Sequence, residues 1–122
     1  MKKLSTLVIM IVLFTFSCQI PDKITLVGKT IEYHYGESKY HVRFDSDSTL
    51  NWMAVAGDEI GAHEDEIYFS EWVGDHLLFI TWGEANGIGV SQILDFEKGK
   101  VYNHLLQGRK VSAGQGEIQF VK

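Results

Sequence analysis

Short runs of β-branched and aromatic residues, separated by turn residues, recur along the chain from Ile24 onward. None of these runs shows the 3.6-residue period of an amphipathic helix, so they indicate antiparallel strands joined by tight turns. Pro21, the only proline, precedes all of them. A domain of about 100 residues cannot bury two separate cores, and a sheet of many short strands removes its edges by closing on itself. We therefore predict an all-β fold over residues 24–122, a small antiparallel up-and-down β-barrel of eight or nine strands.

The positions of the turn residues place these strands. We predict strands at 30–35, 40–44, 50–55, 67–73, 76–82, 90–96, 101–106, 110–112 and 118–121. Two segments are predicted to lie outside strands. The acidic segment 57–65 is interpreted as a solvated loop, and Gly114–Gly116 is interpreted as a break between the last two strands.

The alternation of side chains within the strands assigns their faces. Tyr33 and Tyr35 share one face of the first strand, and Trp82 shares a face of the fifth with Glu84 if that strand extends so far. Two phenols and a carboxylate could orient a polar group of a ligand, and a buried Glu84 could act as an acid or base if its pKa is raised. The alternative is that the tyrosines are ordinary strand residues and that Glu84 lies in a hairpin turn.

The first 18 residues carry the pattern of an export signal. Two lysines precede the apolar run Leu7–Phe16, and Ser17 places a small residue directly before Cys18. The run is short for a membrane span and matches a cleavable signal peptide. Cys18 is the only cysteine, so it cannot form an internal disulfide. We predict a lipoprotein signal at 1–17, lipid attachment at Cys18 and a tether at 18–23. An ordinary secretory signal and a retained membrane anchor are the alternatives.

The charge of the chain limits its partners. Cleavage after residue 17 would change the formal charge from −5 to −7, because it removes Lys2 and Lys3 and no acidic residue. An acidic domain repels phosphate backbones, so nucleic acid is not expected as a partner. The lipid on Cys18 would hold the domain close to a membrane. Gln19 follows the anchor where an aspartate favours inner-membrane retention, and we therefore expect the bacterial cell envelope, on the periplasmic side of the outer membrane.

Other reactive residues are interpreted as structural. His63–Glu66 lacks a second histidine at the spacing of a zinc protease. His34 and His41 could meet across a hairpin, on the outer face of the sheet. Gly83–Gly89 joins two strands and lacks the helix N-terminus of a phosphate-binding loop. We expect neither a metal site nor a cofactor.

Several of these elements together resemble a known family. The segment Ile31–Gly36, Trp52, the segment Thr81–Gly87 and the pair Val90-Ser91 resemble the MoaF-like family, named for molybdenum cofactor biosynthesis protein F. The resemblance covers roughly residues 26–106. It implies a calycin barrel similar to the lipocalins.

The same pattern is similar to the core of bacterial phenolic acid decarboxylases. In those enzymes a tyrosine pair grips the substrate carboxylate, while an arginine and a glutamate act on the phenol end and the proton. Tyr33, Tyr35 and Glu84 match three of these positions. The arginine does not carry over, because Ala62 stands in its place.

Three hypotheses for function follow. The first is a tethered lipocalin-like module that binds a small apolar or aromatic molecule through Tyr33, Tyr35, Trp82 and Glu84. The second is a structural or interaction lipoprotein with a filled core. The third is a lyase acting on a phenolic or carbonyl compound with Glu84 as its acid or base. The first is favoured over the second and the third, so the chain is not expected to be an enzyme.

Overall fold

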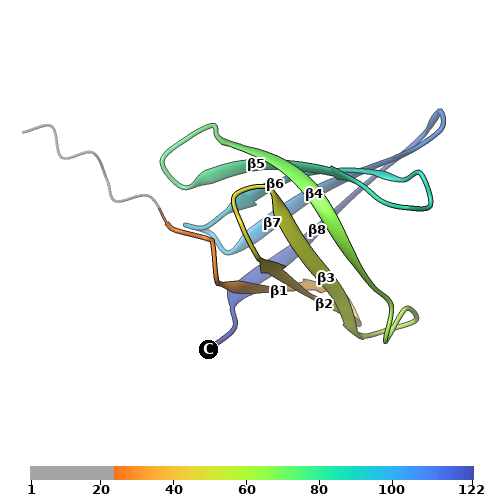
Figure 1. Cartoon of the computed structure of the whole chain (residues 1–122), viewed down its shortest axis with the longest axis horizontal. Helices are drawn as coiled ribbons and strands as arrows, with labels where there is room; N and C mark the ends of the chain where they lie inside the picture. Colours follow the sequence, from red (N-terminus) through yellow and green to blue (C-terminus); the bar gives the residue numbers. More distant parts are fainter. Residues whose placement is uncertain (1–23) are drawn as a thin grey trace, which may run out of the picture.

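The computed structural model describes residues 24–122, which form eight strands and no helix (Figure 1). The predicted signal peptide at 1–17, Cys18 and the tether at 18–23 lie outside the described residues. The strands are β1 (Thr30–Tyr35), β2 (Ser38–Phe44), β3 (Thr49–Ala56), β4 (His63–Trp72), β5 (Leu77–Gly83), β6 (Gly89–Asp95), β7 (Lys100–Gln107) and β8 (Lys110–Phe120). The predicted all-β class is confirmed.

The strands form one closed antiparallel barrel in which each pairs with the next along the chain. Closure comes from β1 and β8, where Ile31 pairs with Phe120 and His34 with Glu117. The predicted up-and-down barrel is therefore confirmed, with eight strands. Within residues 24–122, the structure contains no helix long and apolar enough to cross a membrane.

Two boundaries differ from the sequence prediction. The fourth strand begins at His63, so the last three residues of the segment predicted as a solvated acidic loop, 63–65, are strand, and β4 pairs with β3 through Met53–Thr49. The last two predicted strands are one continuous strand, β8, which passes through Gly114–Gly116 without a break. A Cβ atom at Gly116 would lie 2.5 Å from the backbone oxygen of His34 and 2.8 Å from the Tyr35 ring. Glycine at this position therefore allows a close approach of β1 to β8 rather than a turn.

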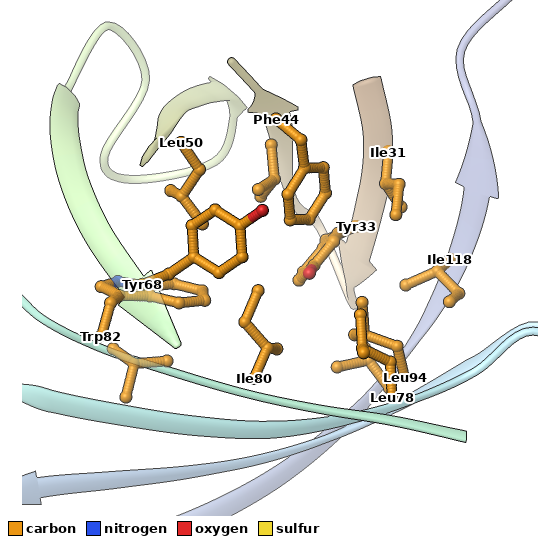
Figure 2. Packing of buried hydrophobic residues seen from close by; sticks show 13 residues of the cluster. Ile31, Tyr33, Phe44, Leu50, Tyr68, Leu78, Ile80, Trp82, Leu94 and Ile118 are labelled. Carbon is orange, nitrogen blue, oxygen red and sulfur yellow. The ribbon is translucent and has the colours of Figure 1, made fainter. Parts of the chain in front are cut away.

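One half of the barrel interior is filled by apolar side chains from all eight strands (Figure 2). We call this region the packed half; its most deeply buried members are Ile31, Phe44, Leu50, Leu78, Leu94 and Val101. The Phe44 and Tyr68 rings meet edge to face, 5.5 Å between centroids. The Tyr68 hydroxyl donates a hydrogen bond of 2.7 Å to the backbone oxygen of Ser46 in the β2–β3 turn. This end of the barrel is therefore closed by tight packing.

The other end carries the β1–β2, β3–β4, β5–β6 and β7–β8 connections, the last three of which lie on the right in Figure 1. The side chains beneath these connections include tyrosine, tryptophan, glutamate, glutamine and asparagine. We call this region the open half, and it holds the candidate site.

Candidate functional site

The open half contains a cavity of about 500 Å³. It is lined by residues from all eight strands and from the β3–β4 and β5–β6 connections. The lining residues are Tyr33, Tyr35, Ser38, Tyr40, Val42, Trp52, Glu59, Ala62, Glu64, Trp82, Glu84, Asn86, Ile88, Val90, Gln92, Asn103, Leu105 and Gly114. A volume of this size lies within the range of ligand pockets, about 300–1,000 Å³.

All four residues singled out from the sequence line this cavity. Tyr33 and Tyr35 alternate along β1 and both point inward, with ring centroids 6.3 Å apart. Trp82 lies near the end of β5 and is buried. Glu84 lies one residue beyond β5, in a turn where the Gly87 amide donates to the Glu84 backbone oxygen at 2.9 Å. The expected turn position and the expected inward position of Glu84 thus both apply.

A row of aromatic rings extends the tyrosine pair across two further strands. Tyr35 meets Tyr40 at 6.1 Å, and Tyr40 meets Trp52 at 6.2 Å, both edge to face. Tyr40 and Trp52 were not among the predicted ligand-binding residues. The register of the β1–β2 hairpin, which pairs Tyr33 with Tyr40, is the signal that connects them to the site.

Carboxylates gather at the mouth of the cavity. Glu59, Glu64 and Glu84 all line it, and Glu66 is buried on the same face of β4, with 6% of its surface exposed. The Tyr40 hydroxyl donates to Glu59, and the Ala85 amide donates to Glu64. These two bonds fix the positions of Glu59, on the β3–β4 connection, and of Glu64, on β4.

The sequence reading of this acidic segment was wrong in one respect. Alternation along β4 turns Glu64, Glu66 and Tyr68 inward, while Ile67 and Phe69 face outward and are 69% and 79% exposed. Two charged residues, Glu64 and Glu66, thus face the interior while two apolar residues face the surface, the reverse of the usual pattern of a half-buried strand.

Burial and mutual repulsion change the proton affinity of these groups. Burial, followed by the neighbouring Glu64, raises the pKa of Glu66 to about 7, against a smaller opposing effect of the Trp52 indole. Burial, followed by the charges of Glu64 and Glu59, raises the pKa of Glu84. Both shifts thus come first from burial and second from repulsion by neighbouring carboxylates.

Four buried polar atoms at the cavity have no hydrogen-bond partner among residues 24–122. They are the hydroxyl oxygen of Tyr33, Nε1 of Trp52, Nε1 of Trp82 and Oε1 of Gln92. The amide nitrogen of Gln92 donates to Asn103 at 3.0 Å, which fixes the orientation of its free oxygen. Burial raises the pKa of Tyr33 well above its usual range, so the phenol stays protonated. Buried polar atoms in native proteins are nearly always satisfied, and these four therefore present unused bonding capacity to the cavity.

The lining contains no lysine, arginine or histidine. Ala62 lines the cavity at the position matched to the decarboxylase arginine. In the part of the chain from residue 24 to 122, no three histidine, cysteine, aspartate or glutamate side chains are grouped closely enough to hold a metal ion. The chemistry on offer is therefore hydrogen bonding, aromatic contact and negative charge.

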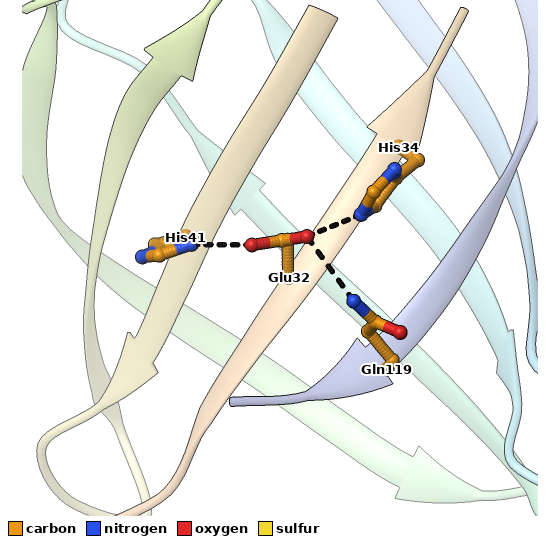
Figure 3. Close-up of polar contacts among 4 residues, drawn as sticks. All are labelled: Glu32, His34, His41 and Gln119. Carbon is orange, nitrogen blue, oxygen red and sulfur yellow. Dashed lines mark hydrogen bonds and ion pairs between the residues drawn. The ribbon is translucent and has the colours of Figure 1, made fainter. Parts of the chain in front are cut away.

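The histidines considered earlier lie on the outer face, away from the cavity (Figure 3). His34 and His41 do come together across the β1–β2 hairpin, but each bonds to a different carboxylate oxygen of Glu32, His41 at 2.8 Å. Gln119 of β8 donates to the same carboxylate at 3.2 Å. These contacts hold the pKa of Glu32 at about 2, and the cluster ties β1 to both of its neighbours.

Comparisons with known proteins bear on the family and the fold. A model of the MoaF-like family matches residues 27–119. A candidate beta-lactamase from Burkholderia vietnamiensis has a similar structure, with a TM-score of 0.74 and 23% identity over 81% of this chain and 98% of that one. At that identity the likeness shows a shared fold alone. No curated protein matches the sequence.

Proposed function

The chain belongs to the MoaF-like family of β-barrel proteins, and from this premise we propose that its barrel is a binding module for a small apolar or aromatic molecule. The observation that carries the proposal is the cavity of about 500 Å³, which lies beside a tightly packed half of the same barrel. Tyr33, Tyr35, Trp82 and Glu84 are its proposed binding residues.

The unpaired polar atoms support an occupied cavity. A buried polar atom without a partner costs about 1–3 kcal/mol. A ligand that bonds to the Tyr33 hydroxyl, the Trp82 indole or the Gln92 oxygen would recover part of that cost, while its apolar body would contact the aromatic row. These features give both an affinity source and an orientation for the ligand.

The two competing functions receive less support from the geometry. An interaction protein with a filled core would not need a cavity of this size. A decarboxylase-like lyase would need, beside its tyrosine pair and glutamate, the arginine that acts with the glutamate on the phenol end and the proton. Ala62 stands in that place, and the lining contains no arginine. Glu84→Gln separates these functions: a lyase would lose turnover and keep binding, whereas a binding module has no turnover to lose.

The proposal is tested by thermal unfolding of residues 19–122, which include the whole closed barrel, against phenolic acids, fatty acids, quinones, flavins and aromatic amines. A ligand at about a hundred times its dissociation constant adds about 2.7 kcal/mol of stability. For a domain of this size the melting temperature should rise by about 10 °C or more. Tyr33→Phe should reduce the shift, and Tyr102→Phe on the outer face should not. A flat response to the whole panel would contradict the proposal.

We further propose that the barrel is lipid-anchored through Cys18, on the periplasmic side of the outer membrane. The support is the signal pattern of residues 1–18. Cells fed a radiolabelled fatty acid should label the wild-type protein and leave Cys18→Ser unlabelled. Fractionation of the envelope should place the labelled protein in outer membranes. Label that persists in the Cys18→Ser variant would contradict the anchor.

A further inference from the structure

We propose that the ligand of this cavity is an organic cation, an amine carried on an aromatic or apolar body, with its charged group at the mouth and its body against the aromatic row. This inference rests on the proposed binding function and names its substrate class. It is drawn from the charge, the ring arrangement and the free acceptors of the lining.

The charge of the lining favours a cation over an anion. Glu59, Glu64 and Glu84 line the mouth, and no basic side chain lines the cavity to neutralise them. A carboxylate ligand would enter a site with three like charges and no counter-charge, which disfavours it. An ammonium group entering the same site would be attracted by each of them, and the low-dielectric walls would strengthen that attraction.

The aromatic row also favours a cation. Tyr33, Tyr35, Tyr40 and Trp52 follow one another edge to face around the wall, with centroids 6.1–6.3 Å apart. A cation within about 6 Å of a tyrosine or tryptophan face is attracted to it, and aromatic-lined sites bind alkylated ammonium groups in this way.

The balance of hydrogen-bond acceptors and donors in the lining favours the same class of ligand. Gln92 is 5% exposed, and its side-chain oxygen has no partner among residues 24–122. This oxygen can only accept a hydrogen bond. The mouth carboxylates are acceptors as well. The Tyr33 hydroxyl, in a residue that is 1% exposed, can accept or donate, and the indole nitrogens of Trp52 and Trp82 can only donate. With the three carboxylates at the mouth, acceptors outnumber donors, which suits a ligand rich in N–H groups.

The spread of the carboxylates favours an organic cation over a metal ion. Glu59 lies on the β3–β4 connection, Glu64 on β4 and Glu84 on the β5–β6 connection. Within residues 24–122 no three such side chains converge closely enough to chelate a metal. Diffuse negative charge around a roomy apolar cavity matches a bulky cation of low charge density.

The test uses three probes that share one body and differ in charge: 2-(1-naphthyl)ethylamine, 2-(1-naphthyl)ethanol and 1-naphthylacetate. Binding to residues 19–122 is measured by calorimetry and by quenching of tryptophan fluorescence at pH 7. We expect the amine to bind at least about tenfold more tightly than the alcohol, and the acid to bind most weakly. Raising the salt concentration from about 50 mM to about 500 mM should weaken binding of the amine and leave binding of the alcohol unchanged.

Charge-neutral variants locate the effect. Glu64→Gln and Glu84→Gln should each lower the affinity for the amine about three- to tenfold and change that for the alcohol less than about twofold. Glutamine at 64 keeps an oxygen for the Ala85 amide, so the bond that holds this position is retained. The matched control is Glu71→Gln, which makes the same change on an outward, exposed position of β4.

The outcomes separate this inference from the proposed function. If the alcohol or the acid binds as tightly as the amine, the inference is overturned while the binding function stands. The same holds if the amine's advantage survives both glutamine variants. If no probe and no member of the wider panel binds, both proposals fall.

Discussion

The two halves of the barrel interior are built by the same eight strands and yet differ in composition and in packing. In the packed half, Ile31, Phe44 and Leu50 are essentially inaccessible to solvent and fill the space between the strands. In the open half, inward positions of the same strands carry Tyr35, Tyr40 and Glu64, which surround a cavity. The fold therefore does not require its whole interior to be filled. The packed half holds the most deeply buried apolar side chains, and the other half encloses a cavity.

The largest difference between the two halves is expected when a substitution creates a cavity in the packed half. Phe44→Ala should lower the free energy of unfolding by about 3–5 kcal/mol, because it removes a fully buried ring that contacts Tyr68. Tyr40→Ala, at a partly buried position on the cavity wall, should cost clearly less. Urea unfolding measures both. Equal losses would show that the open half is as important to stability as the packed half.

Two glycines of β8 test the same contrast at closer range. Gly116→Ala should cost about 2–3 kcal/mol, because its new methyl group would meet the His34 oxygen and the Tyr35 ring within 3 Å. Gly114→Ala should be within about 0.5 kcal/mol of wild type, since no atom lies within 4 Å of its new methyl group. Chemical denaturation of the pair gives the comparison. A mild effect at Gly116 would mean that β1 and β8 can separate at little cost.

The sequence captured the packed half well and the open half poorly. Strands such as β1 and β2, with apolar residues at alternate positions, were placed nearly to the residue. The start of β4 was missed because its inward residues, Glu64 and Glu66, are charged and its outward Phe69 is apolar. Reading a strand from its apolar period assumes that the interior is apolar, and this assumption fails where the interior lines a cavity.

The lining of the cavity could be predicted only in part, for the same reason. Tyr33, Tyr35 and Trp82 lie on strands with clear alternation, so their shared inward direction could be inferred. The contribution of Glu59 and Glu64 depends on how the β3–β4 connection folds over the mouth. Nothing in the local sequence pattern shows that packing, because it is set by contacts with Tyr40 and the β5–β6 turn.

The pH dependence of stability distinguishes the halves by charge. The pKa of Glu66 is raised from 4.5 to about 7, so its ionisation opposes folding: stability is full below about pH 4.5 and falls as the pH rises through about 7. Between pH 5 and pH 8 we expect a loss of about 1–2 kcal/mol, reduced from the full linkage value by solvent at the mouth. Glu66→Gln should remove most of that slope, and Glu71→Gln should not. Denaturant melts across this range provide the measurement, and an unchanged slope in Glu66→Gln would contradict the assignment.

The smallest effect is expected on the outer face of the barrel. The pKa of Glu32 is lowered to about 2, so its stabilising contribution is present above about pH 4.5 and is lost as the pH falls toward 2. Glu32→Gln should cost about 1 kcal/mol at pH 7, because the cluster is partly exposed to solvent. Ligand binding should not change, since Glu32 faces away from the cavity. A change in ligand affinity in this variant would show that the two faces of β1 are coupled.

The closure of the barrel by β1 and β8 has a consequence for how the protein folds. Ile31 pairs with Phe120, so the contacts that complete the barrel join segments from opposite ends of the described chain. Pairing of such distant segments must overcome a large loop-closure entropy before it gains any hydrogen bonds, and topologies of this kind fold slowly, in about milliseconds to seconds. Until that pairing occurs, both strands are bare edges with free amides and carbonyls. The interval before closure is therefore when one copy of this protein is most exposed to pairing with another.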